Sequence, residues 1–187
     1  VLCTELRNKD GQKIRTIEHL MSAVRACNLD NVRVRCSDNE IPILDGSSQH
    51  FVNAIRQVGL KVQQAPRRVL KIRKPVRVTE GDKWVELLPF DGCRYDMEIE
   101  FDNPAIGHQI MTFDLSLDDY IREISMARTF GELKQAAGLH AAGLALGAGP
   151  SNTLIFDESI VVSKEGKRFD DECVRHKILD AIGDLHL

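Results

Sequence analysis

Polar side chains recur at every fourth position in the stretch 170–185. His176, Asp180 and Asp184 are spaced so that a helix would carry them on one face. The packing face of the same helix would be apolar: Val174, Ile178, Leu179 and Ile182. Acidic residues open the stretch and can cap the free N–H groups of a helix. The pattern predicts a helix with a polar file along it.

Apolar residues at helical spacing also predict a helix over 17–27, with Thr16 as its N-cap. Glu18 and His19 lie in its first turn, beside unpaired backbone N–H groups. In this segment alone, Glu18 either complements the helix dipole or acts chemically, and His19 is either a buried structural histidine or a ligand. Alternation predicts a strand over 32–36, and a second helix follows over 49–58.

Short β segments dominate the second half of the chain, and the first four predict an antiparallel sheet: 69–72, 76–78, 84–88 and 95–101. Another strand, over 110–113, precedes a short helix capped by Ser116. The segment 131–142 has helical composition and is surrounded by glycines, so it is either an ordinary helix or a movable apolar insertion. The polar stretch 63–68 contains a proline and is the best candidate for a linker between two halves.

Composition excludes several classes of protein. The chain has 187 residues, 43% of them hydrophobic and 28% charged, which is typical of a globular protein. Its net charge of −3 comes from mixed basic and acidic residues without a basic stripe, which argues against a nucleic-acid partner. Five cysteines without a C-x-x-C motif indicate a reducing compartment. No apolar run approaches the ~20 residues that a membrane-spanning helix needs.

His176 and Asp180 are one helical turn apart and could share a cation. Zinc held by two histidines and a carboxylate, with one position open to water, is typical of hydrolytic enzymes. A second histidine would have to come from elsewhere in the chain. From this spacing alone, a surface ion pair is the commoner interpretation.

Four motifs bear on this choice: Thr16-Ile17-Glu18-His19-Leu20, Pro42-Ile43-Leu44-Asp45-Gly46-Ser47, Ala127-Arg128-Thr129-Phe130-Gly131 and His176-Lys177-Ile178-Leu179-Asp180-Ala181-Ile182-Gly183-Asp184. Together they closely resemble the UDP-3-O-acyl-N-acetylglucosamine deacetylases, the zinc amidohydrolases of lipid A biosynthesis. The similarity covers nearly all of the chain in the family's order. It implies an α+β fold of two related α/β domains, each a sheet covered by helices, packed with the helices facing each other.

The resemblance also implies a site that binds Zn²⁺. The metal ligands would be His19, His176 and Asp180. The catalytic residues would be Glu18 as general base, Thr129 as the hydroxyl that stabilises the oxyanion, and Asp184 as the acid that orients a histidine beyond Leu187. The substrate-binding positions would be Leu2, Cys3, Lys83, Phe101, Phe130 and Lys177. Lys83 has a second interpretation as a solvated turn residue.

By this resemblance, the expected activity is zinc-dependent removal of acetate from UDP-3-O-acyl-N-acetylglucosamine, in the cytoplasm, by a monomer. The family's chain begins before the match to Val1 and continues past Leu187. We therefore expect residues 1–65 to be the C-terminal part of a first α/β domain, and 66–187 to be a second α/β domain with a small βα insertion and without its end. The alternative is an inactive fragment or degenerate relative that binds zinc or nucleotide-sugar without turnover.

Overall fold

The computed structural model describes residues 3–186, which form an α+β fold. Residues 3–87 contain β1 (Glu5–Arg7), β2 (Lys13–Arg15), α1 (Glu18–Ala26), α2 (Gln49–Val58), β3 (Val76–Glu80) and β4 (Lys83–Leu87). Residues 88–186 contain β5 (Arg94–Glu100), β6 (His108–Asp114), α3 (Leu117–Asp119), the π-helix η1 (Tyr120–Ile124), β7 (Phe130–Glu132), α4 (Leu133–Ala141), β8 (Leu154–Asp157), β9 (Ile160–Val161) and α5 (Glu172–Asp184). None of the helices within 3–186 is long and apolar enough to cross a membrane.

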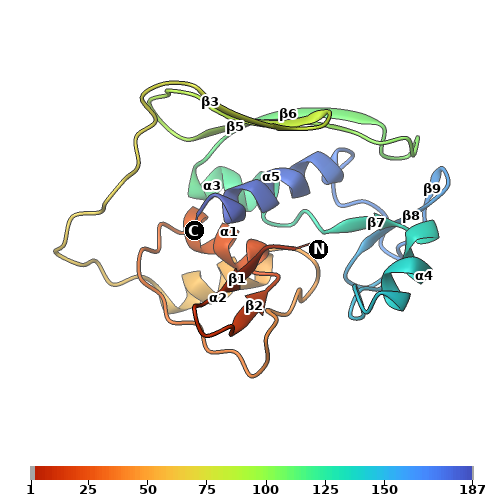
Figure 1. Ribbon diagram of the computed structural model, residues 1–187, viewed down its shortest axis with the longest axis horizontal. Helices are drawn as coiled ribbons and strands as arrows, with labels where there is room; N and C mark the ends of the chain where they lie inside the picture. The colour runs from red at the N-terminus through yellow and green to blue at the C-terminus, as the bar shows by residue number, and fades with distance from the viewer. Residues whose placement is uncertain (1–2, 187) are drawn as a thin grey trace.

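Helix α5 lies at the centre of the molecule. It packs against α1, against the hairpin of β5 and β6, and against η1. Figure 1 shows β5 and β6 above α5 and α1 below it, with β1 and β2 farther down. Helices from the two ends of the chain therefore meet face to face between strands.

Apolar side chains of α1, α2, η1, α5 and β6 form the main core. Its buried members are Ala23, Ala26, Cys27, Val52, Phe113, Tyr120, Ile124, Ile178, Leu179 and Ile182. All four apolar positions that periodicity assigned to the packing face of α5 are buried, so that prediction is confirmed. Burying each such side chain contributes roughly 1.5–3 kcal/mol, which holds α5 firmly between its neighbours.

The strands pair in small groups. The expectation of one antiparallel sheet is wrong, because β3 pairs with β4 and β5 with β6 in two separate antiparallel hairpins. Each hairpin has its register set by its own connection, whereas the described strands form no ladder between the hairpins. Further along the chain, β7 pairs in parallel with β8, and β9 joins antiparallel to β8.

Four local predictions also differ from the structure. Residues 32–36 and 69–72 form no strand, since no described strand lies in ladder register beside either. Thr16 is not the N-cap of α1, because Ile17 holds that position and the Thr16 hydroxyl donates to Glu40 instead. Asp171, the N-cap of α5, makes no capping bond, since its carboxylate accepts from Arg175. Ser116 does cap α3, as expected.

Candidate metal centre

Helices α1 and α5 approach each other closely at Gly183. A Cβ atom at this position would lie 2.0 Å from the backbone oxygen of Glu18 and 3.0 Å from the backbone nitrogen of Ser22. Because real Cβ atoms do not come this close to backbone atoms, only glycine fits at this point. The close approach brings the first turn of α1, with Glu18 and His19, against α5.

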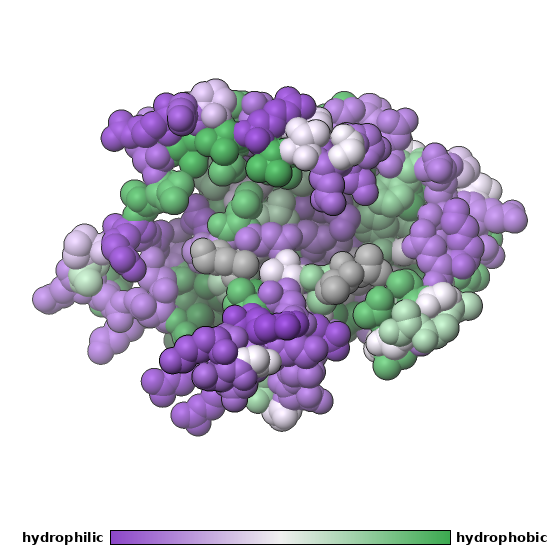
Figure 2. Space-filling view, in the orientation of Figure 1, coloured by the Kyte–Doolittle hydropathy of each residue, from purple (hydrophilic) through white to green (hydrophobic). Residues whose placement is uncertain are grey.

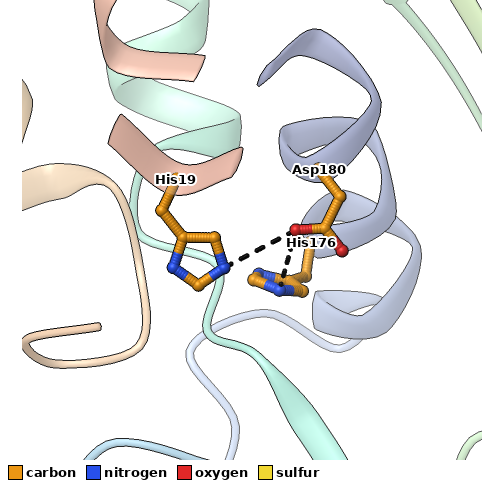
Figure 3. Close-up of side chains that lie close together, drawn as sticks. All are labelled: His19, His176 and Asp180. Carbon is orange, nitrogen blue, oxygen red and sulfur yellow. Dashed lines mark ion pairs between the residues drawn. The ribbon is translucent and has the colours of Figure 1, made fainter. Parts of the chain in front are cut away.

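Three side chains from the two helices meet at this crossing, as Figure 3 shows. Oδ1 of Asp180 lies 3.6 Å from Nε2 of His19 and 3.3 Å from Nε2 of His176. The two imidazoles are nearly perpendicular, with ring centroids 4.9 Å apart. One potential ligand atom from each residue lies within 4.8 Å of the others, which suits a shared metal ion.

The protonation of His176 follows from its surroundings. Its Nδ1 lies 3.0 Å from the carbonyl oxygen of Ala127, which can only accept, so Nδ1 carries the proton. Burial lowers the pKa of His176 to about 4, although Asp180 opposes the shift, and the ring is therefore neutral near pH 7. Burial alone would raise the pKa of Asp180, but His176, His19 and Lys177 hold this pKa well below its usual range. A neutral Nε2 with a lone pair thus faces a carboxylate oxygen.

This arrangement leaves polar atoms without partners. Oδ1 of Asp180 and Nδ1 of His19 are buried and make no hydrogen bond to the described residues. Buried polar atoms are rarely left without a hydrogen-bond partner. The lone pairs of His176 Nε2 and Asp180 Oδ1, which face each other, also repel unless a cation lies between them. The donor set of two imidazoles and one carboxylate therefore fits a divalent metal ion.

Thr4 joins two further carboxylates beside this cluster. Its backbone N–H donates to Glu18 Oε2 at 3.2 Å, and its hydroxyl donates to Asp184 Oδ1 at 2.6 Å. Burial raises the pKa of both carboxylates, against the opposing effect of their hydrogen bonds from Thr4. Thr4 was missed in the sequence, because the contact joins residues far apart in the chain and no periodicity or motif marks it.

Thr129 follows the loop that supports His176. Its N–H donates to the carbonyl oxygen of Gly46 at 2.8 Å. Gly46 has φ +85, and a Cβ atom there would lie 1.9 Å from the backbone oxygen of Asn152, so this close approach requires glycine. The half-buried hydroxyl of Thr129 makes no hydrogen bond to another residue of 3–186 and is available to a ligand.

A model of the UDP-3-O-acyl N-acetylglycosamine deacetylase family matches residues 1–187. The chain belongs to this family. It is 46% identical over 189 residues to the UDP-3-O-acyl-N-acetylglucosamine deacetylase of Vibrio campbellii, and 47% identical over 188 residues to that of Colwellia psychrerythraea. Both alignments cover 100% of this chain and 62% of the relative, so the chain spans less than two thirds of their length.

Three of the substrate-binding positions expected for this deacetylase family gather beside His19, His176 and Asp180, the expected metal ligands. The ring of Phe130 lies edge-on to that of Phe101, with centroids 5.4 Å apart, and 6.3 Å from the ring of His176. Lys177 places its Nζ 5.4 Å from the centre of the Phe130 ring and donates to Asp180 Oδ2 at 3.0 Å. An aromatic pair and a cation thus border the cluster.

Of the other three expected positions, the structure describes Lys83 and Cys3. Lys83 is exposed at the start of β4, and no hydrogen bond or ion pair within residues 3–186 connects it to the expected metal ligands. Cys3 is half-buried next to Thr4. Leu2 lies outside the described residues.

Proposed function

We propose that this chain carries the zinc site of a deacetylase that hydrolyses the N-acetyl amide of an acylated UDP-amino-sugar in lipid A biosynthesis. The proposal rests chiefly on one observation: Nε2 of His176 faces the unpartnered Oδ1 of Asp180 in a buried cluster with His19. Membership of the deacetylase family supports the choice of substrate, since the relatives carry that activity in their names.

The chain's own residues would divide the reaction between them. His19, His176 and Asp180 would hold zinc, which when bound supplies a Lewis acid that makes water more acidic and polarises a carbonyl group. Glu18 would take the proton from the attacking water, and its raised pKa brings it closer to the operating pH of a general base.

Two other groups complete the proposed reaction. The free hydroxyl of Thr129 would donate to the oxygen of the scissile carbonyl as negative charge develops there. Asp184, held by Thr4, would orient a proton donor for the leaving amine. Phe101, Phe130 and Lys177 would bind the substrate beside the metal.

The metal assignment is tested first. We expect the purified chain to bind one zinc per molecule, and His19→Ala, His176→Ala and Asp180→Ala each to weaken zinc affinity by more than about 100-fold, because two remaining protein ligands hold the metal poorly. His140→Ala, at an exposed histidine of α4, is the matched control and should leave zinc content unchanged. Undiminished zinc in the three ligand variants would refute the site.

Glu18→Gln separates metal binding from chemistry. The amide keeps the shape of the side chain but cannot accept a proton from water, so zinc content should stay near that of the wild type while acetate release falls by roughly 10²–10⁴-fold. Turnover that survives in Glu18→Gln would assign the base to another residue. A wild-type chain that binds zinc but releases no acetate would support the non-catalytic alternative.

We also propose the division into units 1–65 and 66–187. Residues 59–75 contain no helix or strand, and Figure 1 shows this stretch looping away from the helices on the left of the view. Arg68 is exposed in it, so brief trypsin treatment should cut there before it cuts within α1 or α5. A cytoplasmic location is proposed as well, supported by five cysteines that are all free thiols, and cell fractionation would test it.

A further inference from the structure

The peptide bond between Ala127 and Arg128 is held at both of its polar ends by side chains of α5. His176 Nδ1 donates to the carbonyl oxygen of Ala127 at 3.0 Å. Glu172 Oε1 accepts from the N–H of Arg128, also at 3.0 Å. Since Glu172 and His176 are four residues apart, one face of α5 makes both contacts. The orientation of this peptide and that of the His176 ring are therefore coupled.

The side chain of Arg128 closes the other side of this contact. Glu172 accepts from Arg128 Nε at 2.9 Å and Nη2 at 3.2 Å, and from the N–H of Arg168 at 2.7 Å. Arg128 Nη2 also donates to the carbonyl oxygen of Gly166 at 2.5 Å. The side chains of Arg128 and Glu172, which form an ion pair, are almost completely buried, at 1% and 0% exposure. The Arg128–Glu172 pair is thus also hydrogen-bonded to the segment 166–168.

Stability alone does not require a charged pair at this position. Desolvating two charges offsets most of their attraction, so well-packed apolar side chains often serve as well as a buried ion pair. The backbone N–H of Arg128, by contrast, needs a hydrogen-bond acceptor in a fixed position. Apolar side chains cannot accept this bond, whereas the Glu172 carboxylate does. The geometry therefore favours orientation of the peptide over stabilisation of the fold.

The orientation of the 127–128 peptide also affects Thr129, the next residue along the chain. Thr129 is bonded to the Arg128 peptide, and its own N–H and carbonyl oxygen are held by Gly46 and Leu154, both at 2.8 Å. A rotation of the 127–128 peptide would therefore turn the His176 ring and strain the anchored Thr129 together.

We propose that Glu172 and Arg128 are positioning residues, a peptide clamp that orients the Ala127–Arg128 peptide and thereby fixes His176 as the Nδ1–H tautomer, with Nε2 open to the metal. The metal-binding role of His176 in this inference rests on the proposed function, whereas the hydrogen bonds of the clamp do not depend on it. With the clamp removed, the carbonyl oxygen of Ala127 no longer has a fixed position. A share of the His176 rings would then carry the proton on Nε2 and could not bind a metal through that atom.

Two variants separate positioning from stability. The double variant Arg128→Met/Glu172→Leu replaces the charged pair by apolar side chains and removes the acceptor of the Arg128 N–H. Glu172→Gln is the conservative variant, since its amide oxygen can still accept from that N–H. Asp171→Asn is the matched control, because it breaks another ion pair of α5, with Arg175, that does not touch the 127–128 peptide.

Each variant is measured in three ways: the thermal unfolding midpoint, zinc affinity by competition with a chromogenic chelator, and the tautomer of His176 by ¹⁵N NMR of metal-free protein. We expect the double variant to unfold cooperatively, to bind zinc about 10–100-fold more weakly, and to show a mixture of tautomers. Glu172→Gln should retain most of the Nδ1–H tautomer and lose less affinity. Asp171→Asn should match the wild type in affinity and tautomer.

A double variant that binds zinc within about twofold of the wild type, with one tautomer, would overturn the clamp. So would loss of zinc affinity in Asp171→Asn equal to that of the double variant, since the effect would then follow general destabilisation. If the double variant does not fold, NMR of the wild type still tests the proposal. A mixture of His176 tautomers in the wild type would contradict it. This NMR measurement uses neither zinc nor substrate, so failure of the proposed deacetylase activity would leave its result intact.

Discussion

The crossing of α1 and α5 buries polar side chains, whereas the hairpin of β3 and β4 exposes apolar ones. At the crossing, His19 and His176 are 3% and 1% exposed. In the hairpin, Val78 and Trp84 are 68% and 55% exposed. Figure 2 shows apolar residues at the surface among polar ones at the top of the molecule, where Figure 1 places β3.

The two regions differ in what fixes the position of their side chains. Burying a polar group costs free energy unless partners are supplied, and His176 and Glu172 of α5 find partners in Ala127 and Arg128. In the hairpin, each side chain depends on its cross-strand neighbour and on water. Substitutions should therefore have large, coupled effects at the crossing and small, independent effects in the hairpin.

Gly183→Ala should have the largest effect. Its methyl group would overlap the backbone of Glu18, so α1 has to move away from α5, at a cost of about 3 kcal/mol or more in unfolding free energy. Zinc affinity should fall as well, because His19 moves with α1. Gly138→Ala in α4, where nothing lies within 4 Å of the new methyl group, is the control and should stabilise the chain by up to about 1 kcal/mol. Urea unfolding measures both, and equal effects would contradict the tight crossing.

Tyr120→Phe should have the next largest effect. The Tyr120 hydroxyl lies 2.7 Å from Ser22 Oγ and 2.5 Å from Ser48 Oγ, and all three residues are fully buried. Removing it leaves two buried hydroxyls without this partner and should lower the unfolding free energy by about 1–3 kcal/mol.

Replacing the two serines at the same time provides the control for Tyr120→Phe. In the triple variant with Ser22→Ala and Ser48→Ala, no hydroxyl of the network remains to be satisfied, so part of the lost stability should return. A triple variant less stable than Tyr120→Phe alone would mean that packing, and not hydrogen bonding, determines the effect.

Local pattern was sufficient for some elements and insufficient for others. The packing face of α5, the helix over 49–58 and the Ser116 cap were correctly predicted, because each depends on residues within a few positions of one another. The strand over 32–36 was wrong, since alternation indicates a strand only when a neighbouring strand supplies hydrogen bonds. Thr16 failed as a cap because its hydroxyl bonds to Glu40, 24 residues away.

In the candidate site, too, some residues could be predicted from local sequence spacing and others could not. Spacing placed His176 and Asp180 on one face of a helix, but no local pattern could bring His19 to them, and this expectation came from family resemblance. Thr4 and the Glu172–Arg128 contact were not found at all in the sequence, because they join residues 14 to 180 positions apart. Contacts of this kind depend on the packed fold.

Trp84→Ala in the hairpin should have the smallest effect. Arg77 lies over the Trp84 ring at 4.0 Å, in cross-strand contact between β3 and β4, and both residues are exposed. A cation–π contact in water is worth about 0.5–1 kcal/mol, so the loss of unfolding free energy should not exceed about 1 kcal/mol. Arg77→Ala should cost a similar amount, and the double variant should cost less than the sum of both. Zinc affinity should not change in any of the three; a loss comparable to that of Gly183→Ala would show that the hairpin and the crossing are mechanically coupled, which the contrast between the two regions does not allow.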